Sequence, residues 1–369
     1  MTAALDRIRG GVPAKRHNAR TIAALTANPG CARRAVLDAA GVDKPRLAER
    51  IGFPGNFGQS RFALARGNGF EAMLKADDCA LLLSVLRDVL ALETSAVSYD
   101  DLGEDDDATL TARHGRTRDL LAAAAGAALI DHPLLTLAVA GRKVFLEPDL
   151  IAFHAGSPSH HPATAHNRTE GGLLHVVEIK SFAIVDGQAD SAKVSGAAVQ
   201  AAVYVLALRR LLADLGHDPA LVSHDAVLVC PRDFSLQPTA VLVDVRKQLS
   251  TLTRQLTRLA SVADLVAALP PTLTFDTALP PADLTAALGQ VEARYAPECL
   301  SACELASYCR HEAAGSTAAL GRPVRDALGG VDTVDEALAL AAGTRTPTEE
   351  QAEAAALLQA AARLRAEAL

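Results

Sequence analysis

Tryptophan is absent from this chain of 369 residues, and methionine (2), tyrosine (4) and phenylalanine (9) are scarce. No apolar run approaches the about 20 residues that a membrane-spanning helix needs, and the N-terminal stretch lacks the apolar core of a secretory signal. We therefore expect a cytoplasmic protein with no membrane partner. In a reducing compartment, clustered cysteines indicate metal binding rather than disulfides.

An overall excess of positive charge is also missing. The formal net charge is −7, so the chain as a whole carries no basic field of the kind that attracts nucleic acid. The charge is unevenly distributed, however, because residues 1–50 hold ten Lys/Arg against four Asp/Glu. The simplest interpretation is solvated surface. This segment and the arginines Arg113, Arg116 and Arg118 are also candidate contacts for phosphates.

Hydrophobic periodicity predicts an α/β fold. The first 130 residues have mostly helical patterns, including residues 31–41 and 77–93. Two strands that turn at Ala140–Gly141, an apolar β-branched run over residues 172–185 and strands at 224–230 and 238–245 flank a helix over 191–216. The Ala-rich tail after residue 346 is predicted to be helical. We expect a helical N-terminal region (1–110), a core (111–268), a linker with a cysteine segment (269–315) and a helical tail (316–369).

Acidic and basic residues interrupt the predicted strands at two places. Asp149 lies in "FLEPDLIAF", and Glu178 and Lys180 lie in "HVVEIKSF". Residues two apart on a strand point to the same face of the sheet. Two carboxylates and an ammonium on one face are costly to bury unless a divalent cation binds the carboxylates, and oxygen ligands suit Mg²⁺ or Mn²⁺. The alternative is an ordinary surface ion pair.

Further polar residues occur at helical spacing on either side of these strands. Gln200 and Tyr204 are four residues apart on the predicted helix, and therefore share one face. Upstream, Gly67 and Glu71 have the same spacing. His114 is a rival of Glu71 for the same role, although a surface position on its helix is the simpler interpretation.

In this order the motifs GxxxE, PD, ExK and QxxxY resemble those of RecB-type nucleases in the PD-(D/E)XK superfamily. The resemblance spans residues 20–312 and implies a restriction-endonuclease-like core, a mixed central sheet flanked by helices. It also implies that Glu71, Asp149 and Glu178 bind Mg²⁺ or Mn²⁺, and that Lys180 is catalytic. Gln200 and Tyr204 match the helix motif that abuts the active site.

Three thiols lie close together in "CLSACELASYCR", at Cys299, Cys303 and Cys309. Tetrahedral zinc and [4Fe–4S] clusters prefer four protein ligands. A subset of these nucleases carries a [4Fe–4S] cluster held by one cysteine before the core and three after it. This subset includes the CRISPR-adaptation nucleases and AddB-like subunits. On that resemblance Cys31 is the fourth ligand. Three residues, rather than the family's two, separate Cys299 from Cys303, which leaves zinc open with His311 as a substitute ligand.

The remaining cysteines and histidines have simpler interpretations. Cys79 and Cys230 are expected to be buried core thiols. The histidines at 154, 160, 161 and 166 lie in a Ser/Pro-rich stretch, which indicates a loop rather than a metal site.

The resemblance implies a metal-dependent DNA nuclease that acts on single strands or DNA ends, as an exonuclease rather than an endonuclease. Repair, recombination or defence are the expected settings. No GxxxxGK[ST] motif is present, so a helicase would have to be a partner protein. One alternative is a catalytically silent subunit that keeps the nuclease fold and binds nucleic acid. Another is a redox sensor whose cluster is the readout.

Overall fold

The computed structural model describes residues 2–26, 28–55, 61–90, 97–103, 108–123, 127–154, 173–233, 235–260 and 262–368. Its contacts divide the chain into two compact units. We call Arg16–Thr26 and Gly58–Ala260 the sheet unit, and Met1–Lys15, Ala27–Phe57 and Ser261–Leu369 the cysteine unit. Both units combine segments that are distant in sequence, whereas the boundaries expected from the sequence at residues 110, 268 and 315 separate continuous domains.

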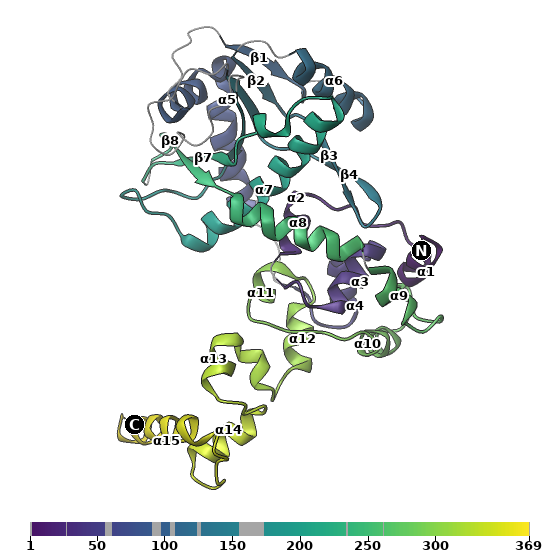
Figure 1. Cartoon of the computed structure of the whole chain (residues 1–369), viewed down its shortest axis with the longest axis vertical. Coiled ribbons are helices and arrows are strands. Elements are labelled where there is room, and N and C mark those ends of the chain that lie inside the picture. The colour runs from purple at the N-terminus through teal and green to yellow at the C-terminus, as the bar shows by residue number, and fades with distance from the viewer. Residues whose placement is uncertain are drawn as a thin grey trace. The chain divides into compact units, whose positions relative to one another are not determined.

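A six-stranded mixed sheet is the centre of the sheet unit, with strand order β1-β2-β5-β6-β7-β8. Figure 1 labels its strands β1, β2, β7 and β8. The β1–β2 and β6–β7 pairs are parallel and the other three pairs are antiparallel. The predicted α/β class with a mixed sheet flanked by helices is therefore confirmed. The strands are β1 (Ser98–Asp101), β2 (Ala128–Asp131), β5 (Leu150–His154), β6 (Leu173–Ile179), β7 (Asp225–Pro231) and β8 (Pro238–Asp244).

The strands β3 (Leu135–Val139) and β4 (Arg142–Leu146) form a separate two-stranded sheet. Their connection is the predicted turn at Ala140–Gly141, where both residues have positive φ angles of 49° and 76°. Two-residue hairpin turns of this kind need positive φ, because their backbone twist matches that of the flanking strands.

Two helices cover opposite faces of the six-stranded sheet. Phe70 and Leu74 of α5 (Arg61–Leu90) pack with Val177 and Val227, whereas Ala197 of α7 (Ser191–Asp214) packs with alternate strand residues such as Leu228. Successive strand residues point to opposite faces, so the two clusters lie on different sides. The other helices of this unit are α2 (Ala19–Ala24), α6 (Leu110–Ala123), the 3-10 turn η1 (Pro219–Leu221) and α8 (Arg246–Ala260).

Helix α5 is broken in its middle. Ala76 has extended backbone, and Asp77, Asp78 and Cys79 have positive φ angles. The helical pattern predicted from residue 77 therefore starts about three residues late. Glu71 belongs to the first half of α5, which ends before this break.

Two short strands were not expected from the sequence. The prediction that the first 130 residues are mostly helical is wrong at β1 and β2, each of which has four residues. β1 reads SYDD, with no apolar alternation. Its pairing with β2, rather than its own pattern, therefore accounts for the strand.

The cysteine unit consists of helices and loops in its described residues. The predicted helix over residues 31–41 is confirmed as α3, which Gly41 ends in a left-handed conformation (φ 69°). The predicted helical tail is present as α15. The helices are α1 (Thr2–Arg9), α3 (Ala32–Ala40), α4 (Lys44–Arg50), α9 (Val262–Ala267), α10 (Pro281–Gly289), α11 (Cys299–Ala302), α12 (Ala306–Glu312), η2 (Thr317–Leu320), α13 (Arg322–Ala327), α14 (Val334–Ala341) and α15 (Ala352–Ala368).

One described helix, α7, is long and apolar enough to cross a membrane when judged only by length and composition. Half of its most apolar window is buried inside the protein, where it packs against β3, β6 and β7. This packing is compatible with the core helix of a soluble protein.

Candidate active site and cysteine cluster

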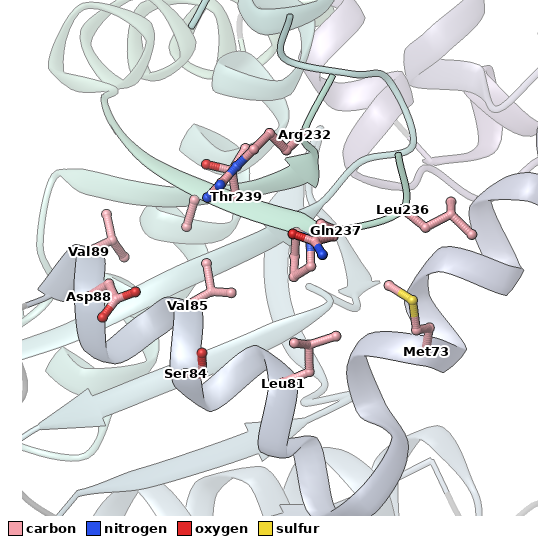
Figure 2. Close-up of a pocket in the computed structure, with 12 residues that line it drawn as sticks. Met73, Leu81, Ser84, Val85, Asp88, Val89, Arg232, Leu236, Gln237 and Thr239 are labelled. Carbon is pink, nitrogen blue, oxygen red and sulfur yellow. The ribbon is translucent and has the colours of Figure 1, made fainter. Parts of the chain in front are cut away.

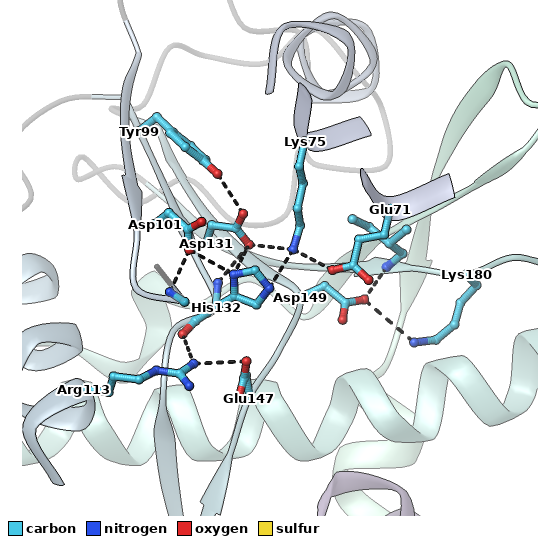
Figure 3. A network of polar contacts seen from close by, with 12 residues as sticks. Glu71, Lys75, Tyr99, Asp101, Arg113, Asp131, His132, Glu147, Asp149 and Lys180 are labelled. Carbon is cyan, nitrogen blue, oxygen red and sulfur yellow. Dashed lines mark hydrogen bonds and ion pairs between the residues drawn. The ribbon is translucent and has the colours of Figure 1, made fainter. Parts of the chain in front are cut away.

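Asp149, Glu178 and Lys180 meet where β5 begins and β6 ends. Leu150 pairs with Val177 in the antiparallel ladder, which places Asp149 next to Glu178. Lys180 Nζ donates a hydrogen bond to Glu178 Oε2. The same nitrogen lies 3.9 Å from Asp149 Oδ2 (Figure 3). The structure therefore brings together the three residues of the PD and ExK motifs.

Burial raises the pKa of both carboxyl groups at this point. Asp149 Oδ2 accepts a hydrogen bond from the Ile179 amide at 2.6 Å, yet burial outweighs this bond and the Lys180 charge, so the pKa of Asp149 is raised. Glu178 is only 1% exposed. Burial raises the pKa of Glu178 to about 8, although the Lys180 ammonium opposes the shift.

One oxygen of Glu178 has no partner. Oε2 accepts from Lys180, but Oε1 is buried without a hydrogen bond from any described residue. An unpartnered buried carboxylate oxygen is costly, and it is a ligand that Mg²⁺ or Mn²⁺ would accept. The donor set at this site therefore fits a divalent cation.

Glu71 lies near these carboxylates without joining them in one cluster. Its negative charge contributes to the raised pKa values of Asp149 and Glu178. Its Oε1 accepts a hydrogen bond from Lys75 at 2.6 Å (Figure 3). The described residues contain two groups of three possible metal ligands whose ligand atoms all lie within 4.8 Å of one another, Asp101–Asp131–His132 and His224–Asp225–Asp244. Neither includes a predicted ligand, so Glu71, Asp149 and Glu178 are close but not gathered.

Gln200 and Tyr204 share a face of α7, as their spacing predicts. Gln200 Nε2 donates to Tyr204 Oη at 3.3 Å. Tyr204 is buried, and burial together with the charges of Glu178 and Asp149 raises its pKa. Tyr204 therefore faces the carboxylates and stays protonated, so that its hydroxyl can donate a hydrogen bond.

A polar network that the sequence did not predict lies beside Glu71. Lys75 lies one helical turn after Glu71 and also contacts Asp131 and His132, and His132 contacts Asp101 (Figure 3). Asp101, Asp131 and His132 form one of the two trios of clustered ligand atoms. The only signal in the sequence was the i, i+4 spacing of Glu71 and Lys75, because Asp131 ends strand β2, His132 follows it, and this strand was not predicted.

His114 is buried rather than on the surface of its helix, so the simpler interpretation of this rival residue is wrong. Its Nδ1 lies 2.7 Å from the Leu134 carbonyl and its ring packs edge-on against Phe145. These contacts indicate a structural role in packing α6 against the β3–β4 hairpin. Arg113, expected as a phosphate contact, instead pairs with Glu147 at 3.0 Å.

All four predicted cluster cysteines belong to the cysteine unit. Cys31 directly precedes α3, Cys299 begins α11, Cys303 follows it, and Cys309 lies in α12. Each is a free thiol. The charges of Cys303 and Cys31 both contribute to the raised pKa of Cys309, after the larger effect of burial. Cys31 and the C-terminal thiols therefore lie within electrostatic reach of one another.

Hydrogen-bond donors point at two of the thiols. Asn28 Nδ2 lies 3.1 Å from Cys299 Sγ, and Arg33 Nη1 lies 3.4 Å from Cys309 Sγ. Asn28 and Arg33 also bind the carbonyls of Arg294 and Val291, respectively. The segment around Cys31 is thus joined to the segment that carries the other three cysteines.

Three residues of the basic N-terminal segment are buried here rather than available to phosphates. Lys44 lies 3.0 Å from Glu304, and Arg33 pairs with Glu312. The charges of Lys44 and Arg34 oppose the burial that raises the pKa of Cys303. Arg34 Nη1 is buried without a hydrogen-bond partner among the described residues, so an unsatisfied donor lies near the thiols.

A tetrahedral zinc site, with Zn–S bonds of about 2.3 Å, would hold its sulfurs roughly 3.8 Å apart. Among the described residues, no three sulfur atoms of this set lie within 4.8 Å of one another. The four thiols, like the three carboxylates, are therefore close but not gathered around one ion. His311 is exposed, and its ring packs against Phe53 at 5.1 Å.

Cys79 and Cys230 are fully buried, as expected. Of the histidine-rich stretch, His160, His161 and His166 lie outside the described residues. The His154 ring stacks on His175 at 5.4 Å.

The described part of the sheet unit contains a cavity of about 700 Å³ and a smaller one. The larger lies between both halves of α5 and the segment that leads into β8, where Met73, Leu81 and Leu236 line it (Figure 2). It contains none of the predicted catalytic residues. The smaller, of about 430 Å³, is lined by Arg66, Phe182 and Lys193 among others, and Phe182 follows Lys180 by two residues.

No protein-family model matches the sequence, and no curated protein is significantly similar to it.

Proposed function

We propose that the chain is a Mg²⁺- or Mn²⁺-dependent deoxyribonuclease with a PD-(D/E)XK core, acting on single strands or DNA ends as an exonuclease. The observation that carries this proposal is the buried, unpartnered oxygen of Glu178, beside Asp149 and the Lys180 ammonium. Ionised carboxylates are costly to bury, and a bound cation would offset that cost. Phosphodiester hydrolysis is the chemistry that uses all three groups.

Asp149 and Glu178 would hold the divalent ion, with Glu71 within reach as a further ligand. When bound, the ion polarises the phosphate and lowers the pKa of a water molecule. The pKa of Lys180 is raised, because the charges of Glu178 and Asp149 outweigh the effect of burial. Lys180 therefore stays protonated near neutral pH and acts as a hydrogen-bond donor that stabilises developing negative charge, not as a base.

The smaller cavity supports a single-stranded substrate. Its Asp190 and Asp233 carboxylates already accept backbone hydrogen bonds, from Lys193 and Asp186 respectively. The side chains of Arg66 and Lys193 are exposed, and neither makes a hydrogen bond or ion pair with another described residue. Two available cations beside one aromatic ring form the combination that binds a strand by its phosphates and one stacked base.

The cysteine set supports a [4Fe–4S] cluster as a structural staple, with zinc as the alternative. Cys31 and the three C-terminal thiols lie about 270 residues apart in sequence but within one unit. A cluster here would stabilise the cysteine unit and take no part in hydrolysis. A helicase or another repair or defence protein would have to supply any motor activity.

A catalytically silent nucleic-acid-binding subunit is the second candidate. The observation that favours it is that Lys180 already binds Glu178 and that the three carboxylates are not gathered. Cleavage decides between the two functions.

The test is cleavage of end-labelled single- and double-stranded DNA by anaerobically purified protein with Mn²⁺. We expect the wild type to cut the single strand from an end. The cleavage rate of Lys180→Ala should fall at least 100-fold, because removing one donor that stabilises developing charge lowers kcat by a factor of about 10²–10³. Lys247→Ala, which alters an exposed lysine of α8, is the matched control and should cut normally. Equal cleavage by Lys180→Ala would refute the assignment, and absence of cleavage by the cluster-loaded wild type would favour the silent subunit.

A further inference from the structure

A second group of metal-type ligands lies beside Glu71. Ligand atoms of Asp101, Asp131 and His132 lie within 4.8 Å of one another. Asp131 is fully buried, whereas His132 and Asp101 are partly exposed. Carboxylate and imidazole side chains in such a group would ordinarily suit a second divalent ion next to the first.

A lysine already contacts two of these three residues. Lys75 Nζ lies 2.6 Å from Glu71 Oε1, 2.8 Å from Asp131 Oδ1 and 3.2 Å from His132 Nε2 (Figure 3). The Lys75 side chain is only 12% exposed. The ammonium cannot leave this position without losing its contacts with Glu71, Asp131 and His132.

Protein donors also contact both oxygens of Asp131 and one oxygen of Asp101. Tyr99 donates to Asp131 Oδ2 at 2.8 Å, and the His132 amide donates to Asp131 Oδ1 at 2.9 Å. Asp101 Oδ1 accepts from the Gly103 amide at 2.7 Å and contacts His132 Nδ1 at 3.0 Å. The contrast with Glu178 is direct, since the buried Oε1 of Glu178 has no partner.

We infer that Lys75 is a built-in cation that takes the place of a second metal ion, so that the active site binds one divalent ion, at Asp149 and Glu178. The inference rests on the proposed function for the first ion. Lys75 is a positioning residue in this scheme: it holds Glu71 by one oxygen and leaves the other carboxylate oxygen available.

Charge explains why the lysine is needed. Glu71, Asp131 and Asp101 bring three carboxylates to one place, and Lys75 is the one permanent cation that contacts any of them among the described residues. If Lys75 is replaced by an uncharged side chain of similar length, the carboxylates remain without a counter-charge. A divalent ion in solution then becomes the available compensation.

The experiment counts Mn²⁺ ions bound to the cluster-loaded full chain by calorimetry and by electron paramagnetic resonance, without DNA. We expect one ion for the wild type and two for Lys75→Met, and the added ion should disappear in Lys75→Met/Asp131→Asn. Lys75→Arg keeps the charge and should bind one ion. Lys247→Met is the matched control and should also bind one.

Each outcome decides a separate point. A wild type that binds no Mn²⁺ overturns the proposed function at its metal site. A wild type that binds one ion while soluble, folded Lys75→Met also binds one, with unchanged Kd, overturns the role of Lys75. If Lys75→Met does not fold, the wild type and His132→Ala decide: one ion with the same Kd in both supports the inference, whereas two ions in the wild type, one of them lost in His132→Ala, refute it.

Discussion

Replacement of Glu178 by glutamine should stabilise the metal-free protein at alkaline pH while abolishing cleavage. Glutamine keeps the size of the side chain and can still accept a hydrogen bond from Lys180, but it carries no charge. The substitution therefore removes the buried negative charge whose Oε1 has no partner. Function and stability are expected to change in opposite directions.

The magnitude follows from the pKa of Glu178, which burial raises from 4.5 to about 8. Between these values the unfolded chain has released the proton that the folded protein keeps, so the folded state binds more protons. Stability of the wild type from this group is fully present below pH 4.5 and is lost as the pH rises towards 8. A shift of this size corresponds to about 5 kcal/mol of unfolding free energy, as an upper limit.

The assay is urea unfolding with EDTA at pH values from 5 to 9, comparing wild type, Glu178→Gln and Asp119→Asn. Asp119 is an exposed aspartate of α6 in the same unit, so its variant controls for loss of one negative charge. We expect the difference between Glu178→Gln and wild type to grow with pH and to level off above about pH 8. Saturating Mn²⁺ at 100 times its Kd should return about 2.7 kcal/mol to the wild type alone. A difference that is flat across this pH range would refute the reasoning about Glu178.

Two further predictions concern the cysteines and the smaller cavity. Cys31→Ala should lose most of the bound iron and its visible absorbance, whereas Cys79→Ala, which alters a buried thiol of the sheet unit, should retain both; equal iron content in the two variants would exclude Cys31 as a ligand. Phe182→Ala should weaken binding of single-stranded DNA, measured by fluorescence anisotropy in Ca²⁺, roughly 5- to 150-fold. The double variant Arg66→Ala/Lys193→Ala should reduce the salt slope of binding by about 1.4, and an unchanged slope would remove these two cations from the binding surface.

The sequence predicted the elements whose structure is determined by residues within the element itself. The turn at Ala140–Gly141, helix α3 with its glycine end and the long helix α7 each follow from residues within the element itself. The convergence of Asp149 with Glu178 and Lys180 was also predictable, because the spacing of two residues on one strand fixes the face of the sheet.

The network around Lys75 could not be predicted in this way. Its members come from α5, β1 and the end of β2, and β1 and β2 have four residues each with no distinguishing pattern. Pairing of these two strands places Asp101 opposite Asp131. A contact that depends on strand register between segments about 30 residues apart has no signature in either segment alone.

Part of the basic N-terminal segment is buried, although its run of charge predicted an exposed surface. Ten lysines and arginines in residues 1–50 suggested either solvated surface or phosphate contacts, yet Arg33, Arg34 and Lys44 are buried beside the cysteines. Their carboxylate partners include Glu304 and Glu312, which lie more than 250 residues away in sequence. Since buried charges are retained only where they are paired, part of this positive charge balances the acidic residues and thiols of the cysteine unit. The unpartnered Nη1 of Arg34 is the remaining donor, and an acceptor bound between the thiols would satisfy it.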